Sequence, residues 1–188
     1  GPDLIRSTYL VDAADFVACH QFNLLERMKV VELARQGGTV LLNSPYPADE
    51  VWDHLPAEVQ RQILDKKLRV FTVDAHRLAR QVGLGSRINT VMQPCFFVLS
   101  GIMPKDDAIR AIKANIAESY GKRGAEVVER NNRAVDLALA ELAEVPVGEF
   151  GAGVRGIQLP AEAPEFVHQV TGRILAGDGD ALPVSALP

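Results

Sequence analysis

The stretch Leu84-Gly85-Ser86-Arg87-Ile88-Asn89-Thr90-Val91-Met92-Gln93-Pro94-Cys95-Phe96-Phe97 divides the chain into two halves. Before it, strand and helix patterns alternate, whereas after it the patterns are helical and then irregular. Its first half places two glycines, a serine, an arginine and an asparagine in a short loop, and its second half is apolar enough to be buried. Polar loops between packed elements often carry ligand contacts in α/β proteins, so this loop is the first candidate for a binding site.

Upstream of this loop, the sequence predicts strands that alternate with helices. Short apolar runs rich in β-branched and aromatic residues are typical of buried strands. Such runs occur at 5–10, 15–19, 39–42 and 68–73. The segments between the last three runs are long enough to be crossovers, so we expect those strands to be parallel and consecutive or nearly so.

Helices are predicted between these strands and after the last of them. Asn23 is a residue type that caps helices and Gly37-Gly38 would stop one, so a helix is expected between them. Its apolar face would consist of Leu24, Leu25, Met28, Val31 and Leu33. A short helix and then a longer one that begins at Pro56 follow. Asp74 is expected to cap a helix over 75–82.

Polar residues follow each of the three predicted parallel strands. They lie in the pairs His20-Gln21, Asn43-Ser44 and Asp74-Ala75, of which only Ala75 is apolar. Because the carboxyl ends of parallel strands lie at one edge of a sheet, these residues are expected to share the edge where α/β proteins bind ligands. For Asn43-Ser44, formation of a turn is the competing interpretation.

Downstream of the loop, the periodicity is helical. It predicts helices over 88–100, from Pro104 onward and over 125–143, and Pro94 would lie inside the first of them. After Val145 the composition shifts to Gly, Pro and small residues.

Two regions are therefore expected, an α/β domain over 1–145 and a connector over 146–188 with a helical pattern only at 165–175. The predicted fold class is α/β, a layered and mainly parallel sheet flanked by helices, with an extended C-terminal connector.

The composition excludes several classes of protein. With 188 residues, 47% of them apolar, and no apolar run near the length of a membrane span, the chain is typical of a soluble globular protein. A net charge of −4 argues against general binding to nucleic acid or to an anionic membrane.

Cys19 and Cys95 have no C-x-x-C spacing and lie among apolar residues, so we expect buried thiols in a reducing, cytoplasmic compartment. The first residues, 1–6, have neither a cationic start nor an apolar core segment, so no secretory signal sequence is expected.

Motifs for known chemistry are few. The glycines Gly83 and Gly85 do not follow a strand and form neither a dinucleotide fingerprint nor a P-loop, which leaves a turn or a phosphate contact as their role. The four histidines lack metal-ligand spacing, and no catalytic triad can be assigned. Arg87 could bind a phosphate or carboxylate, and Asn89 could both donate to and accept from a ligand amide. Alternatively, Asn89 caps the following helix and Arg87 pairs with a carboxylate.

Several segments resemble the third, gamma-type domain of pyruvate:ferredoxin (flavodoxin) oxidoreductase in their amino-acid sequence, their order and their spacing. The most specific is Gly83-Leu84-Gly85-Ser86-Arg87-Ile88-Asn89-Thr90-Val91-Met92-Gln93. The others are 4–11, 14–20, 37–45, 120–124, 131–138 and 166–185. The last of these looks like the approach to a ferredoxin-like domain, so the resemblance covers nearly the whole chain.

The resemblance implies part of an enzyme that decarboxylates pyruvate on thiamine diphosphate, passes electrons through 4Fe-4S clusters to ferredoxin or flavodoxin, and forms acetyl-CoA. This domain would contribute to binding of coenzyme A, with Asn89 as the main contact and Arg87 and Thr90 as companions. The full enzyme would be a cytoplasmic homodimer that binds neither nucleic acid nor membrane.

The resemblance also predicts what this chain lacks. The glycine-rich loop and basic residues that open the domain would lie before Gly1, and the thiamine and cluster domains would be elsewhere, so the chain alone should be inactive. A competing hypothesis is a non-catalytic scaffold that holds the thiamine and iron-sulfur domains together. A third is a free-standing nucleotide-binding protein.

Overall fold

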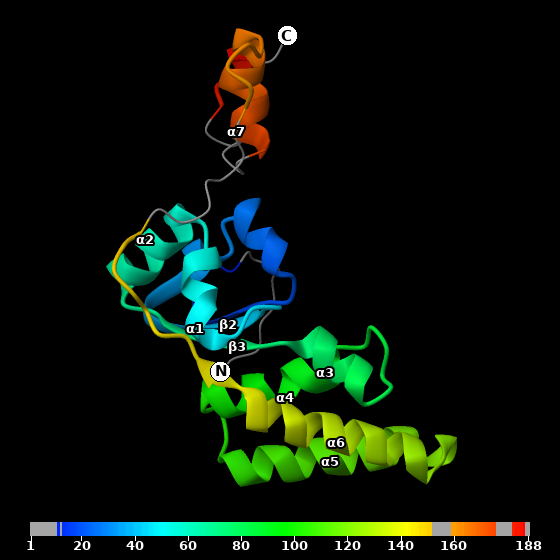
Figure 1. Ribbon diagram of the computed structural model, residues 1–188. Helices are drawn as coiled ribbons and strands as arrows, with labels where there is room; N and C mark the ends of the chain where they lie inside the picture. The colour runs from blue at the N-terminus through cyan, green and yellow to red at the C-terminus, as the bar shows by residue number, and fades with distance from the viewer. Residues whose placement is uncertain (1–10, 12, 152–158, 176–181, 187–188) are drawn as a thin grey trace, which may run out of the picture.

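A four-stranded sheet forms the centre of the protein. The computed structural model describes residues 11, 13–151, 159–175 and 182–186 (Figure 1). The strand order is β1-β2-β3-β4, in which β1 (Ala14–Cys19), β2 (Ala34–Asn43) and β3 (Arg69–Val73) are parallel and consecutive, as predicted. The short strand β4 (Ala143–Glu144) pairs antiparallel with β3 and was not predicted, because two residues carry no periodic signal.

Helices cover both faces of this sheet (Figure 1), which confirms the predicted α/β class. One face carries α1 (Ala48–Val51), the 3-10 turn η3 (Trp52–His54) and α2 (Ala57–Lys66). The other face carries α3 (Ala75–Gln81), α4 (Asn89–Ser100) and α6 (Ala125–Glu141). Helix α5 (Lys105–Tyr120) packs outside α4 and α6 and is joined to α6 by the turn η4 (Gly121–Arg123).

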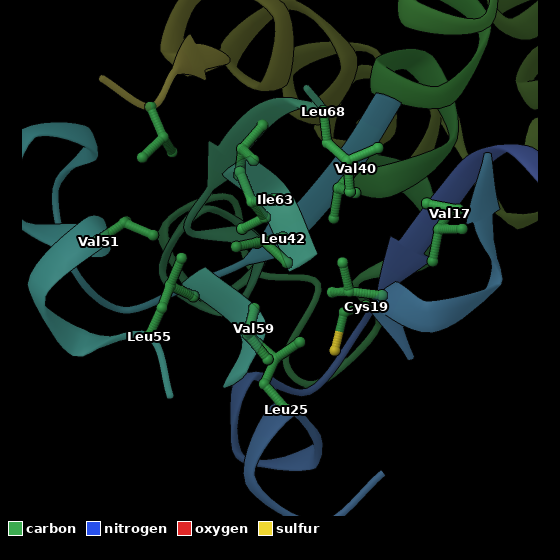
Figure 2. Packing of buried hydrophobic residues seen from close by; sticks show 14 of the residues in the cluster. Val17, Cys19, Leu25, Val40, Leu42, Val51, Leu55, Val59, Ile63 and Leu68 are labelled. Atoms are coloured by element: carbon green, nitrogen blue, oxygen red, sulfur yellow. The ribbon is translucent and has the colours of Figure 1, made fainter. Parts of the chain in front are cut away.

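Alternation along the strands creates the two cores. In β2, Val40 and Leu42 lie on the face toward α1 and α2, whereas Leu41 lies on the face toward α3, α4 and α6. Figure 2 shows the first core, where side chains of β1 and β2 meet those of α1 and α2. Since β2 and β3 are covered on both sides, their sequences are nearly continuous apolar runs, as is usual for parallel sheets, whereas β1 has Ala18 exposed on the face toward α4.

The segment between β1 and β2 corrects one prediction. Instead of a helix from Asn23 to Gly37, the chain forms two 3-10 turns, η1 (Phe22–Glu26) and η2 (Val31–Leu33), and β2 already begins at Ala34. The expected apolar face does not form, because Leu25 and Val31 are buried while Met28 is 57% exposed.

Long-range contacts explain why β2 runs through both glycines. The register of β1 and β2 shifts between Ala14 and Phe16, where extra residues of β2 form a bulge. Gly37 has φ +71°, and a Cβ on Gly38 would lie 2.9 Å from the carbonyl oxygen of Arg35. The glycines are therefore required by the bulge and not by a helix end.

Elsewhere, the helix starts and ends that single residues predict are confirmed. The Asp74 Oδ1 accepts a hydrogen bond from the Arg77 amide at 2.9 Å and caps α3. Pro56 precedes the first turn of α2, Pro94 lies inside α4, and Gly101 ends α4 with φ +64°. None of the helices in the described part of the chain is long and apolar enough to cross a membrane.

The C-terminal segment has little regular structure. A π-helical turn, η5 (Val167–Thr171), continues into α7 (Gly172–Leu175), and together they match the helix expected over 165–175. A 3-10 turn, η7 (Val184–Ala186), follows. In Figure 1 the helical part stands apart from the sheet and its helices. The strand expected at 5–10 and parts of the expected connector lie outside the described residues.

Candidate functional site

The carboxyl ends of the three parallel strands meet at one edge, as expected. Asn43, at the end of the central strand β2, is 3% exposed and ties its two neighbours together. Its Nδ2 donates to the His20 carbonyl oxygen at 2.8 Å, and its Oδ1 accepts from the Ala75 amide at 2.9 Å. The Ser44 amide donates to the Val73 carbonyl oxygen at 3.2 Å. The Asn43 carboxamide thus fixes the loops after β1 and β3 instead of only forming a turn.

A cavity of about 430 Å³ lies beside this edge, between β1 and the beginning of α4. Its polar groups are the side chains of His20, Asn89 and Gln93. Its apolar wall consists of Phe16, Ala18, Met92 and Phe96. The rings of Phe16 and Phe96 pack edge to face at 5.1 Å between centroids, so the wall is built jointly by the strand and the helix.

Asn89 is exposed at the first turn of α4 and lines this cavity. The capping position belongs to Ile88, not Asn89, and the helix start has no side-chain cap. Among the described residues, the Asn89 carboxamide makes no hydrogen bond. It therefore presents both a donor and an acceptor to the cavity.

Arg87 and Thr90 do not line the cavity with Asn89. Arg87 is exposed in the loop, and its Nε donates to the Leu84 carbonyl oxygen at 3.3 Å. No ion pair of Arg87 occurs within the described part of the chain. The Thr90 hydroxyl donates to Asn131 Oδ1 at 3.2 Å and so ties the beginning of α4 to α6.

Several lining residues were not predicted. Gln93 lies four positions after Asn89, which places both on one face of α4, and this spacing was a usable signal. The contribution of Phe16 and Phe96 had no such signal, because the two rings come from a strand and a helix that are far apart in sequence.

A second cavity, of about 480 Å³, lies over the carboxyl ends of all three parallel strands. It is lined by Gln21, Phe22, Asn23, Asn43, Pro45, Asp74, His76 and Arg80. Gln21, Asn43 and Asp74 belong to the predicted ligand edge, whereas Asn23, His76 and Arg80 were not predicted as site residues.

The glycine-containing loop has a structural role in its first part. Gly83 has φ +75°, and the Leu84 amide donates to the Ala79 carbonyl oxygen at 2.8 Å, which closes the end of α3. A third depression, of about 460 Å³, lies beside this turn and includes Arg130 and Arg133. Arg130 is ion-paired with Glu126, as is usual at a solvated surface.

Both cysteines are buried, as predicted, and lie in different cores. Cys19 belongs to the core beneath α1 and α2, and Cys95 to the core beneath α3, α4 and α6. Desolvation raises the pKa of Cys19 and raises that of Cys95 to about 12. No group of three or more potential metal ligands occurs among the described residues. The two thiols cannot serve together as cluster ligands.

Comparison with protein families gives two matches. The model described as pyruvate ferredoxin/flavodoxin oxidoreductase matches residues 2–141. A second model, described only as a domain of unknown function, matches residues 155–188.

Similar curated proteins carry the same description. A putative pyruvate-flavodoxin oxidoreductase of Synechocystis sp. is 50% identical over 192 residues, which is 100% of this chain and 16% of that protein. The pyruvate-flavodoxin oxidoreductase of Rhodospirillum rubrum is 49% identical, with the same coverage. The pyruvate:ferredoxin oxidoreductase of Moorella thermoacetica is 41% identical over 98% of this chain and 16% of that protein. The chain therefore spans about one sixth of the length of these relatives.

A solved structure shares the fold. The crystal structure of pyruvate oxidoreductase subunit PORC from Thermotoga maritima matches with a TM-score of 0.55 and 23% identity. The match covers 71% of this chain and 66% of that one. At this identity the likeness concerns the arrangement of the sheet and its helices.

Proposed function

Since the chain belongs to the pyruvate ferredoxin/flavodoxin oxidoreductase family, we propose that it contributes to binding of coenzyme A as one domain of such an enzyme. The enzyme would oxidatively decarboxylate pyruvate to acetyl-CoA, with ferredoxin or flavodoxin as electron acceptor. We assign the domain to residues 1–145 and a connector toward a further domain to residues 146–188. Support for this division comes from the two family matches, of which the first ends at 141 and the second begins at 155.

The observation that carries the proposal is the unpaired carboxamide of Asn89 in the cavity between β1 and α4. The pantetheine arm of coenzyme A contains two amides separated by methylene groups. One carboxamide can donate to the oxygen of such an amide and accept from its N–H. The apolar wall that includes Phe16 and Phe96 suits the methylene groups between them.

Arg87 and Thr90 are proposed companions of Asn89. The exposed guanidinium of Arg87 precedes Asn89 by two residues and suits a phosphate or carboxylate. Thr90 contributes by holding the beginning of α4 against α6 through Asn131. A shift of this turn would move Asn89, so the contact depends on Thr90 indirectly.

Within this proposal, the chain supplies binding groups and no catalytic residue. Thiamine diphosphate would provide the decarboxylation chemistry and 4Fe-4S clusters the electron transfer, both held by other domains or subunits. The two buried thiols on opposite faces of the sheet support placing the clusters elsewhere. A cytoplasmic homodimer is the proposed state of the full enzyme, on the basis of the family resemblance and of the free thiols.

Isothermal titration of coenzyme A into the full-length enzyme that contains this domain tests the proposal. We expect binding that weakens about tenfold in Asn89→Ala, because the variant loses two hydrogen bonds of roughly 0.5–1.5 kcal/mol each. Asn115→Ala, at an exposed position of α5, is the matched control and should bind as the parent does. Absence of binding, or equal binding by the parent and Asn89→Ala, would refute a role of Asn89.

The alternative function is a scaffold that holds the thiamine and iron-sulfur domains together. It is favoured by large apolar side chains that are exposed in and before the C-terminal segment. They are Val147, Phe150, Phe166, Ile174 and Leu175. Such residues are suited to contact with another domain. Equal binding of coenzyme A by the full-length parent and by Asn89→Ala, together with binding of this chain to the remaining domains of its enzyme, would support this alternative.

A further inference from the structure

The chain that follows α6 crosses from one face of the sheet to the other (Figure 1). Leu142, directly after the helix, packs against the core beneath α3, α4 and α6. Val145, three residues later, is 2% exposed and belongs to the core beneath α1 and α2. Between them β4 pairs with β3, and the Val145 amide donates to the Val70 carbonyl oxygen at 2.8 Å. Residues 142–145 are therefore an integral part of the α/β domain.

Trp52 holds the next stretch of the chain, residues 146–150, which we call the clasp. The indole Nε1 of Trp52 donates to the Glu149 carbonyl oxygen at 3.1 Å. Gly148 lies so close to the ring that a Cβ on it would be 2.9 Å from Nε1 and 3.0 Å from Cδ1 of Trp52. In Figure 1 this stretch runs alongside α2, where the Phe150 ring meets the Arg61 guanidinium. The clasp therefore lies against the side of the domain that carries α1 and α2.

The Trp52 indole is a fixed surface for the clasp. Trp52 is 6% exposed and packs in the core beneath α1 and α2. Its carbonyl oxygen accepts a hydrogen bond from Gln60 Nε2 at 2.7 Å, and Gln60, in α2, is itself 1% exposed. Because Trp52 is held by the core and by α2, a separation of the two surfaces requires movement of the clasp.

The contacts of the clasp are weak in comparison with those of residues 142–145. Val147 and Phe150 are 42% and 51% exposed. The Arg61 guanidinium lies 5.4 Å from the centroid of the Phe150 ring, and the Arg61 side chain is 58% exposed. A single hydrogen bond and a solvent-exposed cation–π contact each change an equilibrium by only about two- to tenfold. Segments with few buried contacts open locally without global unfolding.

We propose that the clasp is releasable, so that residues 146–150 open from Trp52 while β4 stays paired with β3. In the closed state the chain leaves the domain beside α2. The clasp lies between the two regions that match family models, of which the first ends at 141 and the second begins at 155. It therefore sets the side of the domain from which the second region departs. This inference does not depend on the binding of coenzyme A.

Limited proteolysis of the full-length enzyme with a glutamyl endopeptidase tests the clasp. Such a protease cuts after Glu149, in the clasp, and after Glu144, in β4. At low protease concentration the cleavage rate follows the fraction of molecules in which the bond is open. Products are identified by mass spectrometry. Each rate is divided by that of a free peptide with the sequence 143–154 of the same variant, which removes the effect of a substitution on the protease itself.

The parent should be cut after Glu149 about tenfold or more slowly than its free peptide. Gly148→Ala should raise that rate about two- to tenfold, because the Cβ displaces the clasp from the indole. Trp52→Phe, which removes the hydrogen-bond donor, should have an effect of the same size. Gly151→Ala is the matched control, since its Cβ would have no atom within 4 Å, and it should leave the rate unchanged. Cleavage after Glu144 should be equally slow in all four proteins.

Three results would overturn the inference. The first is a parent that is cut after Glu149 as fast as its free peptide. The second is a rate after Glu149 that neither Gly148→Ala nor Trp52→Phe changes. The third is Gly148→Ala accelerating cleavage after Glu144 as much as after Glu149, because β4 would then detach together with the clasp. Gly148 is exposed, so Gly148→Ala keeps the test decisive even where substitution of the buried Trp52 lowers stability.

Discussion

Replacing Asn43 by alanine should destabilise the protein and disorganise the edge on which both cavities depend. The variant leaves the His20 carbonyl oxygen and the Ala75 amide without their partner, and both contacts are shorter than 3 Å in the parent. A buried group left unpaired costs roughly 1–3 kcal/mol. We expect a loss of about 3 kcal/mol, since water can reach one of the two groups from the neighbouring cavity.

The assay is chemical and thermal unfolding. A loss of about 3 kcal/mol corresponds to a fall in Tm of roughly 6–12 °C for a protein of this size. Asn115→Ala, at an exposed position, is the matched control and should stay within about 0.5 kcal/mol of the parent. Asn43→Asp should also destabilise, because it places a carboxylate against the His20 carbonyl oxygen. An Asn43→Ala protein as stable as the Asn115→Ala control would refute the bridging role.

Three further outcomes are expected. Gly38→Ala should lower the free energy of unfolding by about 1–3 kcal/mol, because its Cβ would lie 2.9 Å from the Arg35 carbonyl oxygen; Gly121→Ala, with no atom within 4 Å, should be neutral in the same unfolding assay. Lys67→Gly should raise stability by up to about 1 kcal/mol, since Lys67 has φ +50°, and an unchanged or lower Tm would count against the strain. The Cys95 thiol, with its pKa raised to about 12, should not react with a disulfide reagent at pH 8 until the protein is unfolded, and rapid labelling of the native protein would contradict its burial.

Local signals account for the part of the fold that the sequence predicted. Asp74, Pro56 and Gly101 act through backbone groups a few residues away, so their positions reveal helix ends without knowledge of the tertiary structure. The apolar runs of the three parallel strands are equally local, because each consists of consecutive residues; in β2 and β3 these residues are covered on both faces.

The part that was predicted wrongly depends on distant residues. A Cβ on Gly38 would meet the Arg35 carbonyl oxygen at 2.9 Å and, in the neighbouring strand β1, the Asp15 carbonyl oxygen at 3.2 Å, and the second contact is long-range. The segment before it therefore forms 3-10 turns despite a periodicity that favours a helix. No pattern within residues 23–38 contains this information.

The candidate site likewise has some residues that a local sequence signal reveals and others whose position depends on distant parts of the chain. The polarity of its loop made Asn89 a candidate, and the family resemblance singled it out as the main contact; the structure then places it exposed at the start of α4. The position of Arg80 was not predicted, because the cavity that it lines forms only where the residues after β1, β2 and β3 meet. Asn43 was recognised as part of the ligand edge, but its hydrogen bonds to both neighbouring loops could not be read from a turn motif.

Mapping of the bound ligand tests the central claim most directly, which is that the carboxyl edge of the parallel sheet binds coenzyme A. Amide hydrogen exchange is measured with and without saturating coenzyme A. We predict slower exchange after β1 at 20–23 and at the loop and first turn of α4 at 85–93, with no change in α5. Protection confined to α5 or to the C-terminal segment, with exchange at the sheet edge unaltered, would contradict the claim.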